Sequence, residues 1–322
     1  MIADLETKVL SGFQLAREDA RPLAGMDIES LPELLAAAER LRKRFFGDTI
    51  DVCAIINAKS GACPEDCAYC AQSSSNRSEA AIFPFIGSDA VFERAVEARN
   101  SGVRHFSIVT SGRRTDTAEI KLIAAVIERI SQIGIGTCAS LGLLDREALN
   151  FLKDHGLQRY HCNLETSERF FPYICTTHSF SEKLRTIEDA RAVGLSVCSG
   201  GIFGMGETWQ DRIDLAFQVR EIEADSMPIN FLSPIRGTRL EDMPCLSPED
   251  ALKIIGLTRF ILPKKEIRIC GGRMQTLEAR HTMIFRAGAD SFMTGNYLVT
   301  KGRSYEDDFR MLKDQGLILR TG

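Results

Sequence analysis

Residues 103–141, VRHFSIVTSGRRTDTAEIKLIAAVIERISQIGIGTCASL, contain a strand, a helix and a second strand in quick succession. Residues 103–110 and 135–141 are short runs rich in β-branched side chains, whereas 116–132 has apolar residues at helical spacing. Strands that are separated by a helix of this length usually lie parallel in one sheet. The stretch therefore predicts a strand–helix–strand unit, and the rest of the chain decides how many such units the sheet contains.

The same alternation continues along most of the chain. Strands are expected near 50–56, 103–110, 135–141, 157–165, 195–203, 226–232, 266–270 and 289–295. Helices are expected near 87–100, 116–132, 145–155, 180–193, 208–223, 247–261, 274–287 and 304–315. Eight units without a dividing linker predict an α/β fold, a closed (β/α)8 barrel of the TIM type, with an open doubly wound sheet as the alternative.

The N-terminal residues precede this alternation. Residues 31–46, LPELLAAAERLRKRFF, have apolar residues at helical spacing. We therefore expect an N-terminal helical cap over 1–47 and the barrel over 48–322. In such a barrel, catalytic groups lie at the carboxyl ends of the strands and in the loops that follow them.

Composition narrows the class of protein. The chain has 322 residues and a formal net charge of −4, which gives no basic footprint for nucleic acid. No apolar run has the length of a membrane span and no secretory signal precedes the fold, so a cytoplasmic protein is expected. In such a chain the 10 cysteines indicate metal binding or catalysis, although we expect Cys53 and Cys245 to be small core residues.

Three of the cysteines lie in one short loop. Cys63, Cys67 and Cys70, in SGACPEDCAYCAQS, follow the first predicted strand. A structural zinc site uses four protein ligands, whereas three thiolates can hold three irons of a 4Fe-4S cluster and leave the fourth iron open to a small molecule. The spacing favours the iron–sulfur loop, and zinc with one distant ligand is the alternative.

The loop resembles the signature of the radical S-adenosylmethionine enzymes. The longer string NAKSGACPEDCAYCAQSS is similar to that of one family among them, the biotin synthases. The resemblance extends from about residue 30 to the C-terminus through CASLG, NLETS, VCSGGIFGMGET, PINFLSPIRGT and IRICGGR.

The resemblance implies a reaction and its participants. The cofactors would be a 4Fe-4S cluster, S-adenosylmethionine and an auxiliary iron–sulfur cluster, either 2Fe-2S or larger. A 5′-deoxyadenosyl radical would abstract hydrogen from dethiobiotin, and the auxiliary cluster would supply sulfur to make biotin. A flavodoxin or ferredoxin would donate the electron, and the enzyme would be a homodimer.

The resemblance also assigns binding roles. Residues expected to contact the cofactor are Tyr69, Ser111, Gly112, Glu165, Gly201 and Gly204. Residues expected to contact the substrate are Asn163, Asn230 and His161. Plainer roles stay open, because Glu165 would also suit a helix start, each asparagine a turn or cap, and His161 the core.

The auxiliary cluster is where the sequence departs from the family. Cys138, Cys198 and Arg268 match three of its usual ligands, but Ser107 replaces the fourth, a cysteine, and serine is a poor ligand for a soft metal. Cys270 lies two residues after Arg268, so on a strand both face the same side, and we hypothesise that Cys270 replaces the missing thiolate. Two other cysteines compete for this place, Cys175 and, less strongly, Cys162.

Other functions remain open at this point. A related radical enzyme with the same barrel, of the hydrogenase-cofactor maturase or pyrrolysine-pathway mutase type, is the first alternative. A zinc-binding or iron–sulfur scaffold without catalysis is the second. Cys138 and Cys198 favour biotin synthase over the related enzymes, and the barrel pattern with Asn163 and Asn230 speaks against a scaffold.

Overall fold

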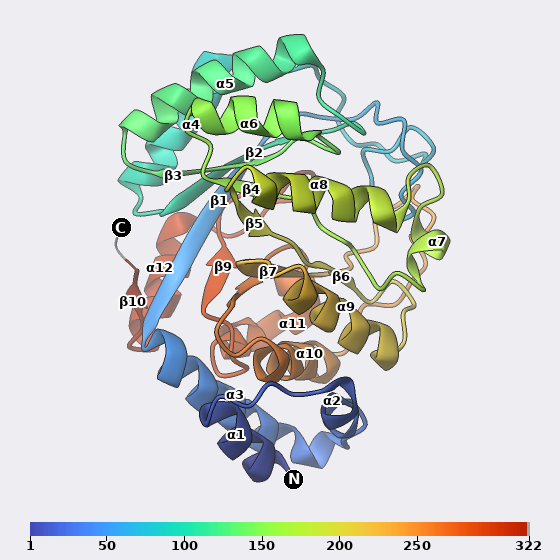
Figure 1. Cartoon of the computed structure of the whole chain (residues 1–322), viewed down its shortest axis with the longest axis vertical. Coiled ribbons are helices and arrows are strands. Elements are labelled where there is room, and N and C mark those ends of the chain that lie inside the picture. The colour runs from blue at the N-terminus through green and yellow to red at the C-terminus, as the bar shows by residue number, and fades with distance from the viewer. Residues whose placement is uncertain (321–322) are drawn as a thin grey trace.

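A closed barrel of eight parallel strands forms the centre of the protein, which a computed structural model describes over residues 1–320 (Figure 1). The strands of the ring are β1 (Thr49–Lys59), β2 (His105–Thr110), β3 (Gly136–Ser140), β4 (Arg159–His161), β5 (Ser196–Cys198), β7 (Ser226–Phe231), β8 (Glu266–Ile269) and β9 (Ser291–Met293). β1 pairs with both β2 and β9, so the ring has no edge. The predicted barrel is confirmed, and the open sheet is wrong.

Helices cover the outside of the barrel at the predicted places. They are α4 (Ser88–Asn100), α5 (Thr117–Gln132), α6 (Arg146–Asp154), α8 (Phe180–Ala192), α9 (Trp209–Glu221), α10 (Pro248–Ile261) and α12 (Tyr305–Asp314). Most begin at a side chain that accepts a backbone N–H of the first turn, such as Asp116 before α5 and Asp145 before α6. Their apolar faces pack on the strands and form one continuous core.

Three segments differ from the sequence prediction. The strand expected at 195–203 divides into β5 and β6 (Gly201–Phe203), because its middle residue Gly200 lies against Pro228, which has no N–H to donate. The helix expected at 274–287 is α11 (Arg273–Leu277) followed by the 3-10 turn η2 (Glu278–Ile284). Two short elements were not predicted, α7 (Phe171–Ile174) and β10 (Ile318–Leu319), which pairs with β1 outside the ring.

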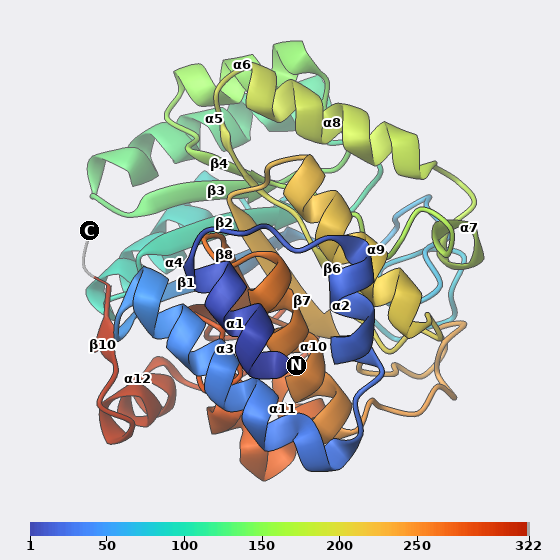
Figure 2. The same cartoon turned by 60° about the horizontal axis from the view of Figure 1, so that its bottom comes forward.

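The N-terminal segment is helical and lies on the outside of the barrel. It consists of α1 (Ile2–Leu10), α2 (Arg17–Ala24), the 3-10 turn η1 (Ile28–Ser30) and α3 (Leu31–Phe46). Figure 2 shows these helices in front of α10, and α3 packs on α10 while α2 packs on α9. Gly256 of α10 permits the approach, because a Cβ there would lie 3.1 Å from Leu34. The division of the chain at residue 47 stays a prediction.

Replacing Ser179 with alanine is expected to lower the free energy of unfolding by about 1 kcal/mol. Ser179 caps α8 in a capping box, in which its side chain accepts from Glu182 N and the Glu182 carboxylate accepts from Ser179 N. Urea unfolding measures the change. Ser131→Ala is the control, because its hydroxyl bonds only a carbonyl of its own helix, and a loss as large there would contradict the capping argument.

Candidate active site

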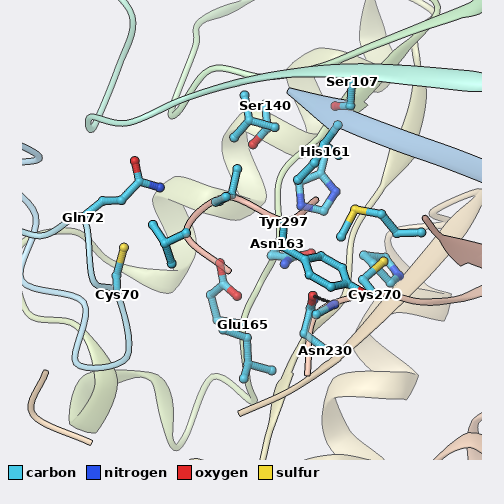
Figure 3. A pocket seen from close by; sticks show the side chains of 18 of the residues that line it. Cys70, Gln72, Ser107, Ser140, His161, Asn163, Glu165, Asn230, Cys270 and Tyr297 are labelled. Atoms are coloured by element: carbon cyan, nitrogen blue, oxygen red, sulfur yellow. Dashed lines mark hydrogen bonds between the residues drawn. The ribbon is translucent and has the colours of Figure 1, made fainter. Parts of the chain in front are cut away.

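One cavity of about 440 Å³ opens at the carboxyl ends of the strands and continues down the barrel (Figure 3). Most of the residues predicted from the sequence line it: Cys63, Tyr69, Cys70, Ser111, Gly112, Cys138, His161, Asn163, Glu165, Cys198, Asn230, Arg268 and Cys270. Three predicted residues do not line it, namely Cys67, Gly201 and Gly204. The cavity thus joins the thiols of the loop after β1 to a second group of thiols on the strands.

Hydrogen bonds hold the cysteine loop in a fixed shape. Asn76 Nδ2 donates to the carbonyl oxygens of Cys67 and Cys70, at 3.1 Å and 2.8 Å. Cys63 N donates to Gln72 O, and Ser74 N donates back to Cys63 O. Asn76 therefore positions the loop, a role that the cysteine spacing alone did not reveal.

The loop thiols are protonated without a metal. Burial raises the pKa of Cys70 to about 11 and also raises the pKa of Cys63. Backbone N–H groups of Glu65 and Gly112 oppose the rise at Cys63 by favouring its thiolate. A bound cation must therefore displace protons, and the N–H groups that face Cys63 are suited to a charged sulfur ligand.

Glu165 and Tyr69 lie together above the barrel. Glu165 has φ +72°, an unusual conformation for a residue other than glycine, and its Oε2 is buried without a hydrogen-bond partner among the described residues. Lys183 Nζ lies 3.7 Å from Oε1. Burial, with the charge of Glu165, raises the pKa of Tyr69 well above its ordinary value. An unpartnered acceptor at the cavity wall suits a ligand with hydroxyl groups.

The two glycines predicted at the cofactor instead allow close backbone packing. A Cβ on Gly201 would lie 2.2 Å from Glu165 O, so only glycine lets β6 lie against that residue. Gly204 has φ +97°, and its N–H donates to the Glu207 carboxylate. Neither glycine faces the cavity, because the Cα of Gly201 lies against Glu165 and the N–H of Gly204 is bonded to Glu207.

The two asparagines combine a structural contact with a position on the cavity wall. Asn163 Oδ1 accepts from Gly200 N at 3.2 Å, which leaves its NH₂ group for the cavity. Asn230 Oδ1 accepts from Gly271 N at 2.9 Å and its Nδ2 donates to Gly201 O at 3.2 Å. Figure 3 shows both beside His161 and Glu165. These bonds join segments far apart in the chain, so neither asparagine is the turn or cap residue of the alternative.

We expect acid to destabilise the protein through His161. Burial lowers its pKa to about 4 from 6.5 in the unfolded chain, so the unfolded state binds the proton first as the pH falls. The stability is present above pH 6.5 and is lost towards the folded pKa, by about 2 kcal/mol between roughly pH 7 and 5. Urea unfolding of His161→Asn should show a smaller loss over this interval, and an unchanged loss would contradict the assignment.

The deep part of the cavity holds a second group of thiols. Cys53 of β1, Cys138 of β3 and Cys198 of β5 line it beside Arg159 and Arg268. Burial raises the pKa of Cys138 to about 12, the charge of Arg159 opposes the rise, and a thiolate at Cys53 adds to it. Two guanidinium groups beside buried thiols favour the thiolate form, which is the form that binds metal.

Arg268 is only partly neutralised by its neighbours. Its Nη2 donates to Asp51 Oδ2 at 2.8 Å and to Glu266 Oε2 at 3.2 Å. Its Nη1 is buried and has no partner among the described residues. A free donor beside thiols fits an anionic sulfur-rich group, because a buried N–H without an acceptor is costly.

The remaining cysteines correct several expectations. Cys53 is not a core residue, since it lines the cavity, and Cys245 is exposed rather than buried. Cys162 packs in the hydrophobic core and points away from the cavity, as the alternation with His161 and Asn163 predicts. Cys175 lies outside the cavity, with its sulfur 3.8 Å from that of Cys67.

Comparison with known proteins agrees with this geometry. Residues 57–219 match the radical SAM superfamily, which places the chain among the radical S-adenosylmethionine enzymes. Residues 228–318 match the biotin and thiamin synthesis associated domain. The chain belongs to the biotin synthase family. It is 49% identical to the biotin synthase of Thermodesulfovibrio yellowstonii over 91% of this chain and 92% of that protein. It is 44% identical to that of Geobacter metallireducens over 98% and 97% of the two.

Solved structures share the fold at low identity. Methylornithine synthase has a TM-score of 0.86 and 22% identity, covering 98% of this chain and 97% of that one. An FeFe-hydrogenase maturase from Carboxydothermus hydrogenoformans has a TM-score of 0.84 and 18% identity, covering 98% and 78%. These values show a common barrel, and the far higher identity to biotin synthases disfavours the related enzymes as alternatives. Over residues 1–320 none of the helices has the length and apolar character to cross a membrane.

Proposed function

We propose that this protein inserts sulfur into dethiobiotin to form biotin, using S-adenosylmethionine and two iron–sulfur clusters. The observation that carries the proposal is the presence of two separate groups of thiols along one cavity, one at its mouth and one deep in the barrel. The first group suits a radical-generating cluster and the second a sulfur donor. Membership in the biotin synthase family supports the same reaction.

At the mouth of the cavity, Cys63 and Cys70 would hold the 4Fe-4S cluster together with Cys67, whose sulfur would turn in from its place beside Cys175. When bound, this cluster and S-adenosylmethionine supply the one-electron chemistry that removes hydrogen from unactivated carbon. Glu165 has a free carboxylate oxygen to accept from ribose hydroxyls, and Tyr69 beside it offers a partly buried ring for the adenine. Ser111 donates to Gly61 O at 2.7 Å, so it fixes the loop and leaves Gly112 N–H directed at Cys63.

In the deep cavity, Cys138, Cys198 and Arg268 would hold the auxiliary cluster together with Cys53. Cys53 acts electrostatically on Cys138 and Cys270 and is itself affected by Cys198, so it lies among these thiols. Cys270 is not among the largest influences on the pKa of Cys138, whereas Cys53 is. Cys53 therefore replaces the thiolate that Ser107 lacks better than Cys270 does. Cys270, whose sulfur contacts Arg268 O at 3.7 Å, remains the second candidate.

Between the two thiol groups, polar side chains suit the ureido ring of dethiobiotin. Asn163 offers an NH₂ group, and Asn230 lies beside it in the cavity. An amide both donates and accepts, as a cyclic urea requires. The imidazole of His161 is neutral at pH 7, because burial lowers its pKa, so it too can donate or accept.

The family resemblance supports three further parts of the proposal. A flavodoxin or ferredoxin supplies the electron, the working form is a homodimer, and the reaction takes place in the cytoplasm. The electron must enter near the cysteine loop, because electron transfer to a buried cluster requires a short path. The mouth of the cavity at the carboxyl ends of the strands offers that path.

An anaerobic assay tests the function. Reconstituted protein, S-adenosylmethionine, dithionite and dethiobiotin are expected to give both 5′-deoxyadenosine and biotin, which mass spectrometry quantifies. If 5′-deoxyadenosine forms without biotin, the substrate or the auxiliary site is wrong. If iron-loaded protein forms neither, the radical reaction itself is wrong.

A further inference from the structure

A cluster of ligand-type side chains lies behind the cysteine loop, outside the cavity. Cys67 Sγ lies 3.8 Å from Cys175 Sγ, and Cys175 Sγ lies 3.3 Å from Nδ1 and 3.9 Å from Nε2 of His178. Ligand atoms of these three residues all lie within 4.8 Å of one another. The Glu65 carboxylate contacts His178 Nδ1 and holds the imidazole from behind, outside this group of three. The proposed function assigns no role to Cys175, His178 or Glu65.

The cluster is buried and held by its surroundings. The exposed fractions are 3% for Cys175, 9% for His178 and 6% for Glu65. Thr177 Oγ1 donates to Glu65 Oε2 at 2.7 Å, and the ring of Phe171 packs edge-on against His178. The backbone of residues 175–178 is positioned by two helices, because α7 ends just before Cys175 and α8 begins just after His178. The side chains are therefore set by the fold and need no ligand to bring them together.

The distances from Cys175 to the other two residues match one tetrahedral metal ion. Two sulfurs bound at about 2.3 Å to a tetrahedral zinc ion lie about 3.8 Å apart, and a sulfur and an imidazole nitrogen lie about 3.5 Å apart. The observed Cys67–Cys175 separation is 3.8 Å, and the Cys175–His178 separations of 3.3 and 3.9 Å bracket the second value. Two sulfurs and one imidazole are ligands that zinc accepts, and water can take the fourth position of a tetrahedral ion.

The charges also fit a divalent cation. Two thiolates and the Glu65 carboxylate bring three negative charges, and a divalent ion leaves one. Arg113 Nη1 lies 3.5 Å from Glu65 Oε1 and offsets it. Lys183 lies near Cys67 and Cys175 as a second cation, with its ammonium 3.7 Å from Glu165. The site is therefore close to neutral when a divalent ion is bound.

We propose that the chain binds one Zn²⁺ ion through Cys67, Cys175 and His178 when the 4Fe-4S loop is empty, with water as the fourth ligand and Glu65 orienting the His178 imidazole. Cys67 is needed by both metals, so zinc and the cluster exclude each other. Zinc keeps the central thiol of the loop, Cys67, protected, and its removal is required before the cluster assembles. The zinc site rests on the proposed function only through the shared Cys67.

Zinc titration of the metal-free full chain tests the site under anaerobic conditions. The background carries Cys138→Ala and Cys198→Ala, so that the deep cavity has lost two thiols. Zn²⁺ is added against a chromophoric chelator of known affinity. Replacing Cys175 with serine or His178 with glutamine should weaken one zinc site by about 100-fold, whereas Cys63→Ala should leave it intact.

The zinc ligands can also be identified directly, in a chain that holds no iron–sulfur cluster. Zinc K-edge absorption of the background chain should show two sulfur and two nitrogen or oxygen ligands. Three sulfurs per zinc, or loss of zinc in Cys63→Ala with retention in Cys175→Ser, would assign the ion to the three loop cysteines and overturn the proposal. The number of sulfur ligands per zinc decides the question even if the Cys63→Ala or Cys175→Ser chain does not fold.

Cluster assembly gives the second readout. In the chain with its natural deep-cavity cysteines, one equivalent of zinc should slow reconstitution of the 4Fe-4S cluster, and Cys175→Ser should remove the delay while still acquiring the cluster. Equal delays in both chains would contradict mutual exclusion. If the proposed function fails instead, 5′-deoxyadenosine is absent with or without zinc, so the two failures are distinguishable.

Discussion

Cys53→Ala is expected to lower biotin formation by more than about 100-fold, because loss of a metal ligand should exceed the 10–100-fold cost of losing a residue that only orients one. Formation of 5′-deoxyadenosine should continue, since Cys63, Cys67 and Cys70 are untouched. The iron content should fall by that of the auxiliary cluster. Mass spectrometry of both products, with iron analysis of the same preparation, measures whether biotin formation is lost while 5′-deoxyadenosine formation continues.

Two matched variants decide between the candidate thiols. Ser107 lies opposite Cys138 in the β2–β3 register, and the sequence resemblance predicts a cysteine there, so Cys53→Ala combined with Ser107→Cys should recover the cluster. Cys270→Ala should keep most of it. A chain that loses the auxiliary cluster in Cys270→Ala and retains it in Cys53→Ala would restore the ligand set predicted from the sequence.

The barrel could be predicted from the sequence because each strand–helix unit repeats a strong local pattern. The helix at 116–132 has a regular apolar face and an acidic cap, and the structure begins α5 at Thr117 after Asp116. The prediction of one continuous fifth strand was wrong for a tertiary reason, since its interruption depends on Pro228 of a neighbouring strand. Local spacing carries no information about which residue will lie opposite.

The sequence predicts the site residues that lie close together in the chain, but not those that only the folded barrel brings together. The spacing of Cys63, Cys67 and Cys70 alone predicts a metal-binding loop. Cys53 was predicted as core because a lone cysteine in an apolar strand has the same appearance whether it faces helices or the barrel centre. Cys175 and His178 lie more than 100 residues from Cys67 in the chain, so only the folded structure brings them to the loop.

Asp290→Ala is expected to cost about 3–5 kcal/mol of unfolding free energy, because it leaves a buried charge without its partner. Arg259 has an exposed fraction of 0% and donates through Nη2 to Asp290 Oδ1. Its Nε donates to Gly288 O at 2.8 Å, and Asp290 Oδ1 accepts from Ile267 N at 2.8 Å. The pair thus ties α10 to the segment that enters β9, the strand that closes the ring on β1.

Urea unfolding of the metal-free chain measures this loss against a surface pair. Asp89 has an exposed fraction of 87% and contacts Arg129 at 2.8 Å, so Asp89→Ala should cost less than about 1 kcal/mol. Arg259→Met combined with Asp290→Leu should recover much of the loss, because a well-packed apolar pair carries no desolvation cost. Equal effects of Asp290→Ala and Asp89→Ala would mean that barrel closure does not depend on the buried pair. In that case the core contacts between β9 and its neighbours would suffice to close the ring.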